Sequence, residues 1–143
     1  MPVWGFFYGG LINPSVMKRV GFHPTKQVRA WLPGFDLRIS PWVNLIESEG
    51  DMVFGLLLES THDQLAHVYG QLQAKYLPYP VLAYDDERRA VPALCYIVPD
   101  MAPGQAAVDH VMNLLNPAQA LGFPAWYIEK IQSFLPPEAE AAV

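Results

Sequence analysis

The sequence is short of charge, of cysteine and of long apolar runs, and each shortage excludes a class of protein. Only 16% of the 143 residues are charged, and the nine Lys and Arg are scattered in a chain of net charge −5. We therefore expect no nucleic-acid partner. No apolar run approaches the ~20 residues of a membrane-spanning helix, so we expect no membrane partner. The single Cys95 excludes an internal disulfide and is typical of a reducing compartment.

Signals for export, metal binding and nucleotide binding are also missing. The first ten residues, MPVWGFFYGG, contain neither a basic region nor a cleavage site of small residues, so we expect a cytoplasmic protein. His62 and His67 are five positions apart and would not share a helix face, a spacing that does not suit a metal site. Neither GxxxxGKS/T nor GxGxxG nor GxSxG occurs, and we predict no metal and no cofactor.

Apolar residues and prolines are plentiful. The chain is 52% hydrophobic and contains fourteen prolines, roughly twice the average usage. This composition indicates one compact domain with short elements and sharp turns. We assign residues 1–136 to that single domain and residues 137–143 to a frayed C-terminal tail.

Apolar periodicity predicts a mixed order of strands and helices. Strands are expected at 3–8, 27–31, 35–39, 52–58, from about 78, and at 91–98. Helices are expected at 14–20, 62–73, 106–115 and 124–134. The breaks between elements are a turn at Pro33-Gly34, an exposed loop at 47–51, a turn at 85–87 and a helix break at Asn116-Pro117. This order favours an α+β or α/β domain built around a mixed, barrel-like sheet.

The most informative short stretch is FFYGGLINPSVM, residues 6–17. An aromatic strand ends at Gly9-Gly10, and Asn13 followed by Pro14 is typical of a helix start. Glycines let the backbone approach a ligand closely, and the free N–H groups at a helix start attract an anion. Alone, the stretch fits either an anion-binding nest or an ordinary tight turn.

Further motifs follow this turn in a particular order. YGGL with Asn13-Pro14 is followed by WLPGF at 31–35, VFGLL at 53–57, LAHVYG at 65–70, ALCYIV at 93–98 and GFPAWY at 122–127. In this order they resemble the γ-glutamylcyclotransferase-like (AIG2-like) superfamily over residues 4–135. The resemblance implies an α+β fold, a small mixed β-barrel with flanking helices. It also implies a pocket in which the glycine turn holds a γ-glutamyl group while one glutamate acts as general acid/base and 5-oxoproline is released.

The resemblance also assigns individual residues. The substrate-binding residues that it implies are Tyr8, Gly9, Gly10, Leu11, Tyr76 and His110. Gly10 stands where active members usually carry Ser or Thr. The position of the catalytic glutamate is occupied by Tyr69, and a phenol, with an ordinary pKa near 10, is a poor base at neutral pH.

Several functions fit this pattern, and the sequence does not specify an oligomeric state. One is an active cyclotransferase or related amide-processing enzyme whose base has been replaced, with Glu59 and His110 as candidates. Another is a non-catalytic binding module for a small γ-glutamyl or other carboxylate-bearing ligand. A third is different chemistry in the same pocket, with Tyr69 as acid or His110 as base. The last is a structural role in which the aromatic rings fill the pocket.

Overall fold

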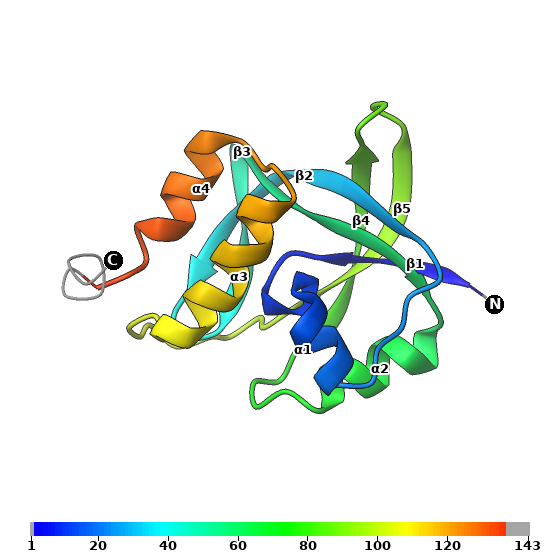
Figure 1. Cartoon of the computed structure of the whole chain (residues 1–143), viewed down its shortest axis with the longest axis horizontal. Coiled ribbons are helices and arrows are strands. Elements are labelled where there is room, and N and C mark those ends of the chain that lie inside the picture. The colour runs from blue at the N-terminus through cyan, green and yellow to red at the C-terminus, as the bar shows by residue number, and fades with distance from the viewer. Residues whose placement is uncertain (1, 137–143) are drawn as a thin grey trace.

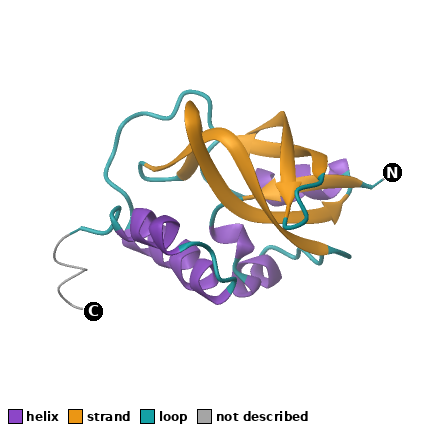
Figure 2. Cartoon of the chain, turned by 90° about the horizontal axis from the view of Figure 1, so that it is seen from above, coloured by secondary structure: helices purple, strands orange, loops and turns teal. Residues whose placement is uncertain are grey.

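Among residues 2–136, which the computed structural model describes, five strands close into a barrel flanked by helices (Figure 1). The strands are β1 (Val3–Phe7), β2 (Gln27–Ile39), β3 (Val43–Ser60), β4 (Leu77–Asp85) and β5 (Ala90–Ile97). The helices are the 3-10 helix η1 (Gly10–Ile12), then α1 (Pro14–Arg19), α2 (His62–Gly70), α3 (Val108–Ala120) and α4 (Ala125–Gln132). In Figure 2 most of the helical residues lie along one side of the barrel.

The barrel has the strand order β1-β3-β2-β4-β5. Strand β1 pairs in antiparallel fashion with β3 and in parallel fashion with β5. The remaining neighbours, β2 with β3, β2 with β4 and β4 with β5, are all antiparallel. The sheet is therefore mixed and closed, which confirms the predicted α+β class with a small mixed β-barrel.

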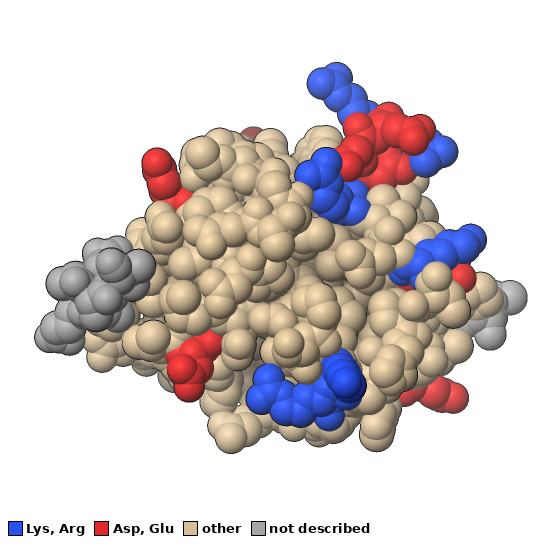
Figure 3. All heavy atoms as spheres, viewed as in Figure 1, with Lys and Arg blue, Asp and Glu red and all other residues tan. Residues whose placement is uncertain are grey.

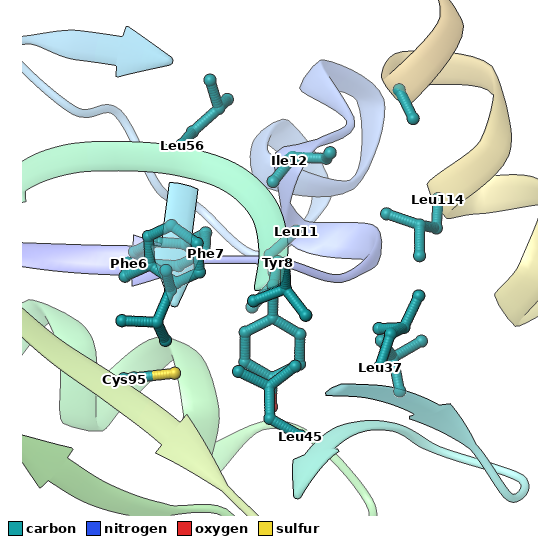
Figure 4. Close-up of a cluster of buried hydrophobic side chains, with 14 of the residues drawn as sticks. Phe6, Phe7, Tyr8, Leu11, Ile12, Leu37, Leu45, Leu56, Cys95 and Leu114 are labelled. Atoms are coloured by element: carbon teal, nitrogen blue, oxygen red, sulfur yellow. The ribbon is translucent and has the colours of Figure 1, made fainter. Parts of the chain in front are cut away.

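Large apolar side chains form the core of the molecule. Phe6 and Phe7 on β1, Leu37 on β2 and Leu56 on β3 are buried (Figure 4). Cys95 lies in the same core, and burial raises the pKa of its thiol. Because the thiolate is the reactive form of cysteine, a buried thiol with a raised pKa is an inert part of the core.

Two helix starts form through the caps that the sequence contains. The side chain of Asn13 accepts a hydrogen bond of 3.0 Å from the Ser15 N–H, and Pro14 occupies the first helical position of α1. Thr61 and Gln64 form a reciprocal capping box at the start of α2, with hydrogen bonds of 2.9 and 3.1 Å. Local side-chain chemistry therefore places the two helices that begin directly after β1 and β3.

Pro33-Gly34 is not the turn that the sequence predicts, and residues 47–51 are not a loop. Strand β2 runs through Pro33-Gly34 with a register shift, so that Pro33 pairs with Met52 and Phe35 pairs with Glu47. The extra residues of β3 stand opposite Gly34, which has a φ of +84° that glycine tolerates. The polar residues 47–51 are accommodated in an irregular stretch of the long β2–β3 hairpin.

Pro117 does not end its helix, contrary to the prediction. Helix α3 continues to Ala120, although proline cannot donate a hydrogen bond to the carbonyl of Asn113 four residues earlier. That carbonyl instead accepts a hydrogen bond of 3.4 Å from the Asn13 side chain. A contact from the start of α1 thus satisfies the group that Pro117 leaves free.

The other helix boundaries differ from the predictions by a few residues. Helix α3 begins at Val108 rather than 106, and α2 ends at Gly70 rather than 73. The predicted frayed tail, 137–143, lies outside the described residues. No helix within residues 2–136 is long and apolar enough to cross a membrane.

Candidate functional site

A cleft of about 510 Å³ opens beside the glycine turn at the end of β1. Its walls come from that turn, from one face of α1, from the start of β3, from the chain between Tyr69 and Tyr76, and from the N-terminal half of α3. These segments are far apart in the sequence. The barrel brings them together because β1 lies next to β3 and β5.

All the site residues predicted from the sequence line this cleft. They are Tyr8, Gly9, Gly10, Leu11, Tyr69, Tyr76 and His110. The structure therefore brings the predicted residues together around one space, while their role in binding or catalysis stays a prediction. The alternative in which the aromatic rings leave no cavity is wrong, because the cleft is open beside them.

The glycine turn begins η1. The N–H groups of Ile12 and Asn13 donate to the carbonyls of Gly9 and Gly10, both at 3.0 Å. Within residues 2–136, the N–H groups of Gly10 and Leu11 donate to no other protein group, as is usual for the first residues of a helix. The turn therefore offers two backbone donors next to the cleft.

The two glycines differ in the space around them. A Cβ on Gly9 would lie 3.2 Å from Val43 Cβ, closer than side chains ordinarily pack. A Cβ on Gly10 would meet only Asn113 Cβ, at an ordinary contact of 3.5 Å. Glycine is thus needed for close packing at position 9, whereas position 10 has room for a small side chain.

Two tyrosine hydroxyls of the cleft are held by backbone carbonyls. Tyr8 Oη donates to the Tyr96 carbonyl at 2.6 Å, and Figure 4 shows its ring directed from the turn into the core. Tyr76 Oη donates to the Val43 carbonyl at 2.5 Å. These bonds tie the turn to β5 and the segment after α2 to β3, so they set the shape of the cleft.

Tyr69, which the motif resemblance predicts to stand in place of a catalytic glutamate, lies within a group of aromatic rings. Its ring stacks on Tyr96 with centroids 4.2 Å apart and an interplanar angle of 5°. The ring centroids of Phe7 and Tyr76 lie 5.6 and 5.5 Å from the centroid of the Tyr69 ring. Its hydroxyl hydrogen-bonds to no other group among the described residues. Burial, followed by the nearby Cys95 and Tyr76, raises the pKa of Tyr69 well above 10. Tyr69 is therefore a neutral hydrogen-bond donor at pH 7 and not a base.

His110 and Trp42 form another side of the cleft. The Nδ1 atom of His110 lies 2.9 Å from the Pro41 carbonyl oxygen, so Nδ1 carries a hydrogen and Nε2 is the acceptor in the neutral ring. The imidazole packs against the Trp42 ring with centroids 5.0 Å apart. Trp42 was missed by the sequence analysis because no motif contains it.

Arg19, at the end of α1, also lines the cleft and was missed by the sequence analysis. Its guanidinium forms no ion pair within residues 2–136. Helical spacing could have predicted this position, because Arg19 lies three residues after Val16 and therefore on the same face of α1. Figure 3 shows Lys and Arg side chains gathered over this helix.

Within residues 2–136, none of the residues that line the cleft is an aspartate or a glutamate. Glu59, the carboxylate proposed as a replacement base, accepts a hydrogen bond from Thr25 and pairs with Lys26 away from the cleft. The carboxylate of Asp85 accepts hydrogen bonds from the backbone N–H groups of Arg89 and Glu87, and these bonds lower its pKa. Among the described residues, no three His, Cys, Asp or Glu gather as metal ligands would.

No family model matches the sequence, and no curated protein matches it either. A solved γ-glutamyl cyclotransferase is similar to this chain with a TM-score of 0.76 and 17% identity, over 95% of this chain and 89% of that one. The chain has the γ-glutamylcyclotransferase-like fold.

Two further structures share this fold. An uncharacterized human protein is similar with a TM-score of 0.78 and 17% identity, over 94% of this chain and 89% of that one. A yeast γ-glutamyl cyclotransferase specific to glutathione is similar with a TM-score of 0.67 and 13% identity, over 93% and 95% of the two chains. The γ-glutamylcyclotransferase-like fold that the motifs predicted is thus confirmed.

The buried tyrosines predict a loss of stability at alkaline pH. Burial raises the pKa values of Tyr8, Tyr69 and Tyr76 above 10. Below pH 10 these phenols are protonated in the folded and in the unfolded chain. Above pH 10 the tyrosines of the unfolded chain lose their protons first. The free energy of unfolding should then fall, by up to about 1.4 kcal/mol per pH unit for each tyrosine. Urea unfolding at pH 8, 9, 10 and 11 measures this.

The Tyr69→Phe variant is the matched control, because it keeps the ring and removes one titrating group. Its stability should fall less steeply above pH 10 than that of the wild type. Identical slopes for the two proteins would contradict the assignment of Tyr69 as a phenol whose pKa is raised by the fold.

Proposed function

We propose that this protein binds a small carboxylate-bearing ligand at the Tyr8–Leu11 glycine turn, without the cyclotransferase reaction for which two of its structural neighbours are named. The observation that supports it best is the composition of the cleft. The turn, Arg19 and Tyr69 supply hydrogen-bond donors, and no carboxylate among the described residues lines the cleft to move a proton. Positioning without a carboxylate base favours binding over intramolecular acyl transfer.

A second candidate function is proton transfer by His110 in the same cleft. The contact between Nδ1 and the Pro41 carbonyl orients the ring and leaves Nε2 as its acceptor nitrogen, an arrangement that general bases use. Incubation with γ-glutamyl amino acids, γ-glutamylamines and glutathione, followed by an assay for 5-oxoproline, separates the two candidates. We expect no turnover by the wild-type protein. Turnover that disappears in His110→Ala would favour the second candidate.

Crowding the glycine turn should abolish binding. In Gly10→Val, two methyl groups would stand beyond the Cβ that already meets Asn113, next to the free N–H groups of the turn. We expect affinity for carboxylates such as glutarate to fall at least about tenfold, the effect of losing one charge-assisted hydrogen bond. Calorimetric titration and ligand-induced shifts of the unfolding temperature measure the change.

The matched control is Gly10→Ala, whose single Cβ fits at 3.5 Å. It should retain affinity within about threefold, because it removes no donor and adds no clash. If Gly10→Val folds normally and binds as the wild type does, the ligand site lies elsewhere in the molecule.

A further inference from the structure

Among the described residues that line the cleft, Arg19 contributes a positive charge and no residue contributes a carboxylate. Arg19 lines the cleft without an ion-pair partner among the described residues. Asn113 and Gln73 contribute neutral amides to the lining. An anion entering this space gains a guanidinium, and guanidinium groups bind carboxylates through paired hydrogen bonds.

A cation finds no counter-charge in the same space. A γ-glutamyl group carries an ammonium on the carbon that bears its α-carboxylate, so a site for it must accommodate both charges. The motif resemblance places Tyr69 at the position of the family's glutamate, and none of the described residues that line the cleft is an Asp or Glu. Amide oxygens can accept a hydrogen bond from an ammonium, but they supply no negative charge to offset its desolvation.

Aromatic rings can bind a cation through their faces, but here the rings cover one another. Tyr69 stacks face to face on Tyr96 at 4.2 Å and has Phe7 and Tyr76 beside it. Trp42 has the His110 imidazole packed against it. The rings therefore form a packed wall and not a cage for an ammonium.

Apart from a third amide, from Gln71, much of the remaining lining is apolar. Val16 on α1, Val20 at its C-terminal cap and Leu72 after α2 contribute to it, together with Val43 at the start of β3. A ligand made only of charged and polar groups would leave this surface without a partner. A ligand with an apolar part would remove it from water, at roughly 25 cal/mol per Å².

We propose that the ligand of this cleft is a carboxylate that has an apolar body and lacks an ammonium group, with Arg19 as the residue that selects for the negative charge. This inference rests on the proposed function, since it specifies the ligand of the same site. It distinguishes the cleft from one built for a γ-glutamyl amino acid.

Three probes test the inference with the whole wild-type chain. Glutaranilate and γ-L-glutamylanilide share the terminal carboxylate, the amide and the phenyl ring, and differ only in the ammonium. Glutaramate lacks both the ammonium and the ring. Calorimetric titration should show glutaranilate binding at least about tenfold more tightly than γ-glutamylanilide, as expected for an unpaired charge at the site. Glutaramate should bind more weakly than glutaranilate.

The outcomes separate this inference from the proposed function. Equal binding of the two anilides, or tighter binding of γ-glutamylanilide, overturns the inference and leaves carboxylate binding intact. Equal affinities for glutaramate and glutaranilate would overturn the inference that the ligand has an apolar body. Binding of none of the probes overturns the proposed function as well.

A pair of variants on α1 tests the role of Arg19. Arg19→Gln should weaken glutaranilate binding at least about fivefold, and the loss should shrink at high salt. Lys18→Gln is the control, because Lys18 is the neighbouring basic residue and does not line the cleft. It should change affinity less than about twofold, a typical limit for an exposed charge. Equal losses in the two variants would overturn the assignment to Arg19.

Discussion

Replacement of Tyr69 by glutamate is expected to produce measurable 5-oxoproline release from γ-glutamyl substrates, starting from no release in the wild type. The motif resemblance places Tyr69 at the position of the family's general acid/base, and in the structure Tyr69 lines the cleft beside the glycine turn. A carboxylate at this position would provide the missing proton acceptor. It would also supply the negative charge that a γ-glutamyl ammonium requires. A positioned general base contributes typically about 10²- to 10⁴-fold to a rate.

The surroundings of position 69 favour this gain. Burial beside the rings of Phe7 and Tyr96 would raise the pKa of a carboxyl there, as burial raises the pKa of the Tyr69 phenol. A raised pKa brings a carboxyl nearer to neutral pH, where it can both accept and donate a proton. Because the stack on Tyr96 is lost and a polar group is buried, we expect Tyr69→Glu to lose about 1–3 kcal/mol of stability.

Tyr69→Phe is the control for this experiment, because it keeps the aromatic packing and provides no base. It should release no 5-oxoproline. If Tyr69→Glu folds and remains inactive towards γ-glutamyl amino acids, γ-glutamylamines and glutathione, then the cleft does not hold a γ-glutamyl group in the geometry for attack.

Replacement of Gly55 by alanine is expected to be the most destabilising small change in the barrel. Gly55 lies on β3, where a Cβ would come within 2.1 Å of the Phe7 carbonyl oxygen and 3.0 Å of Phe6 Cζ. The first of these is backbone of β1, which pairs with both β3 and β5 and cannot move freely. We expect a loss of at least about 3 kcal/mol, at the upper end of the cost of overpacking a core.

Gly70→Ala provides the matched control in the same chain. A Cβ on Gly70, at the end of α2, meets nothing within 4 Å. It should change stability by less than about 1 kcal/mol, in the stabilising direction, because alanine has less freedom to lose on folding. Urea unfolding of Gly55→Ala and Gly70→Ala measures this difference in stability. Similar unfolding midpoints for the two variants would contradict the close approach of β1 to β3.

The sequence by itself determined the architecture and much of the cleft. Strand patterns, the Asn13 cap and the order of six motifs predicted a small mixed barrel with flanking helices. The same motifs selected residues from separate segments, and these line one cleft. Such features are local, since caps and apolar periodicity depend on neighbours in the chain.

Only the tertiary structure decided which other groups reach the cleft. Twelve of the fourteen Asp and Glu lie within residues 2–136, and no sequence pattern shows that none of these twelve lines the cleft. Arg19 and Trp42 belong to no motif, and the helix break expected at Pro117 is absent because Asn13, one hundred residues away, satisfies the freed carbonyl. The raised pKa of Tyr69 likewise comes from rings on β1 and β5 and after α2. Contacts between distant segments, and the burial they produce, set these properties, and a local pattern carries no information about them.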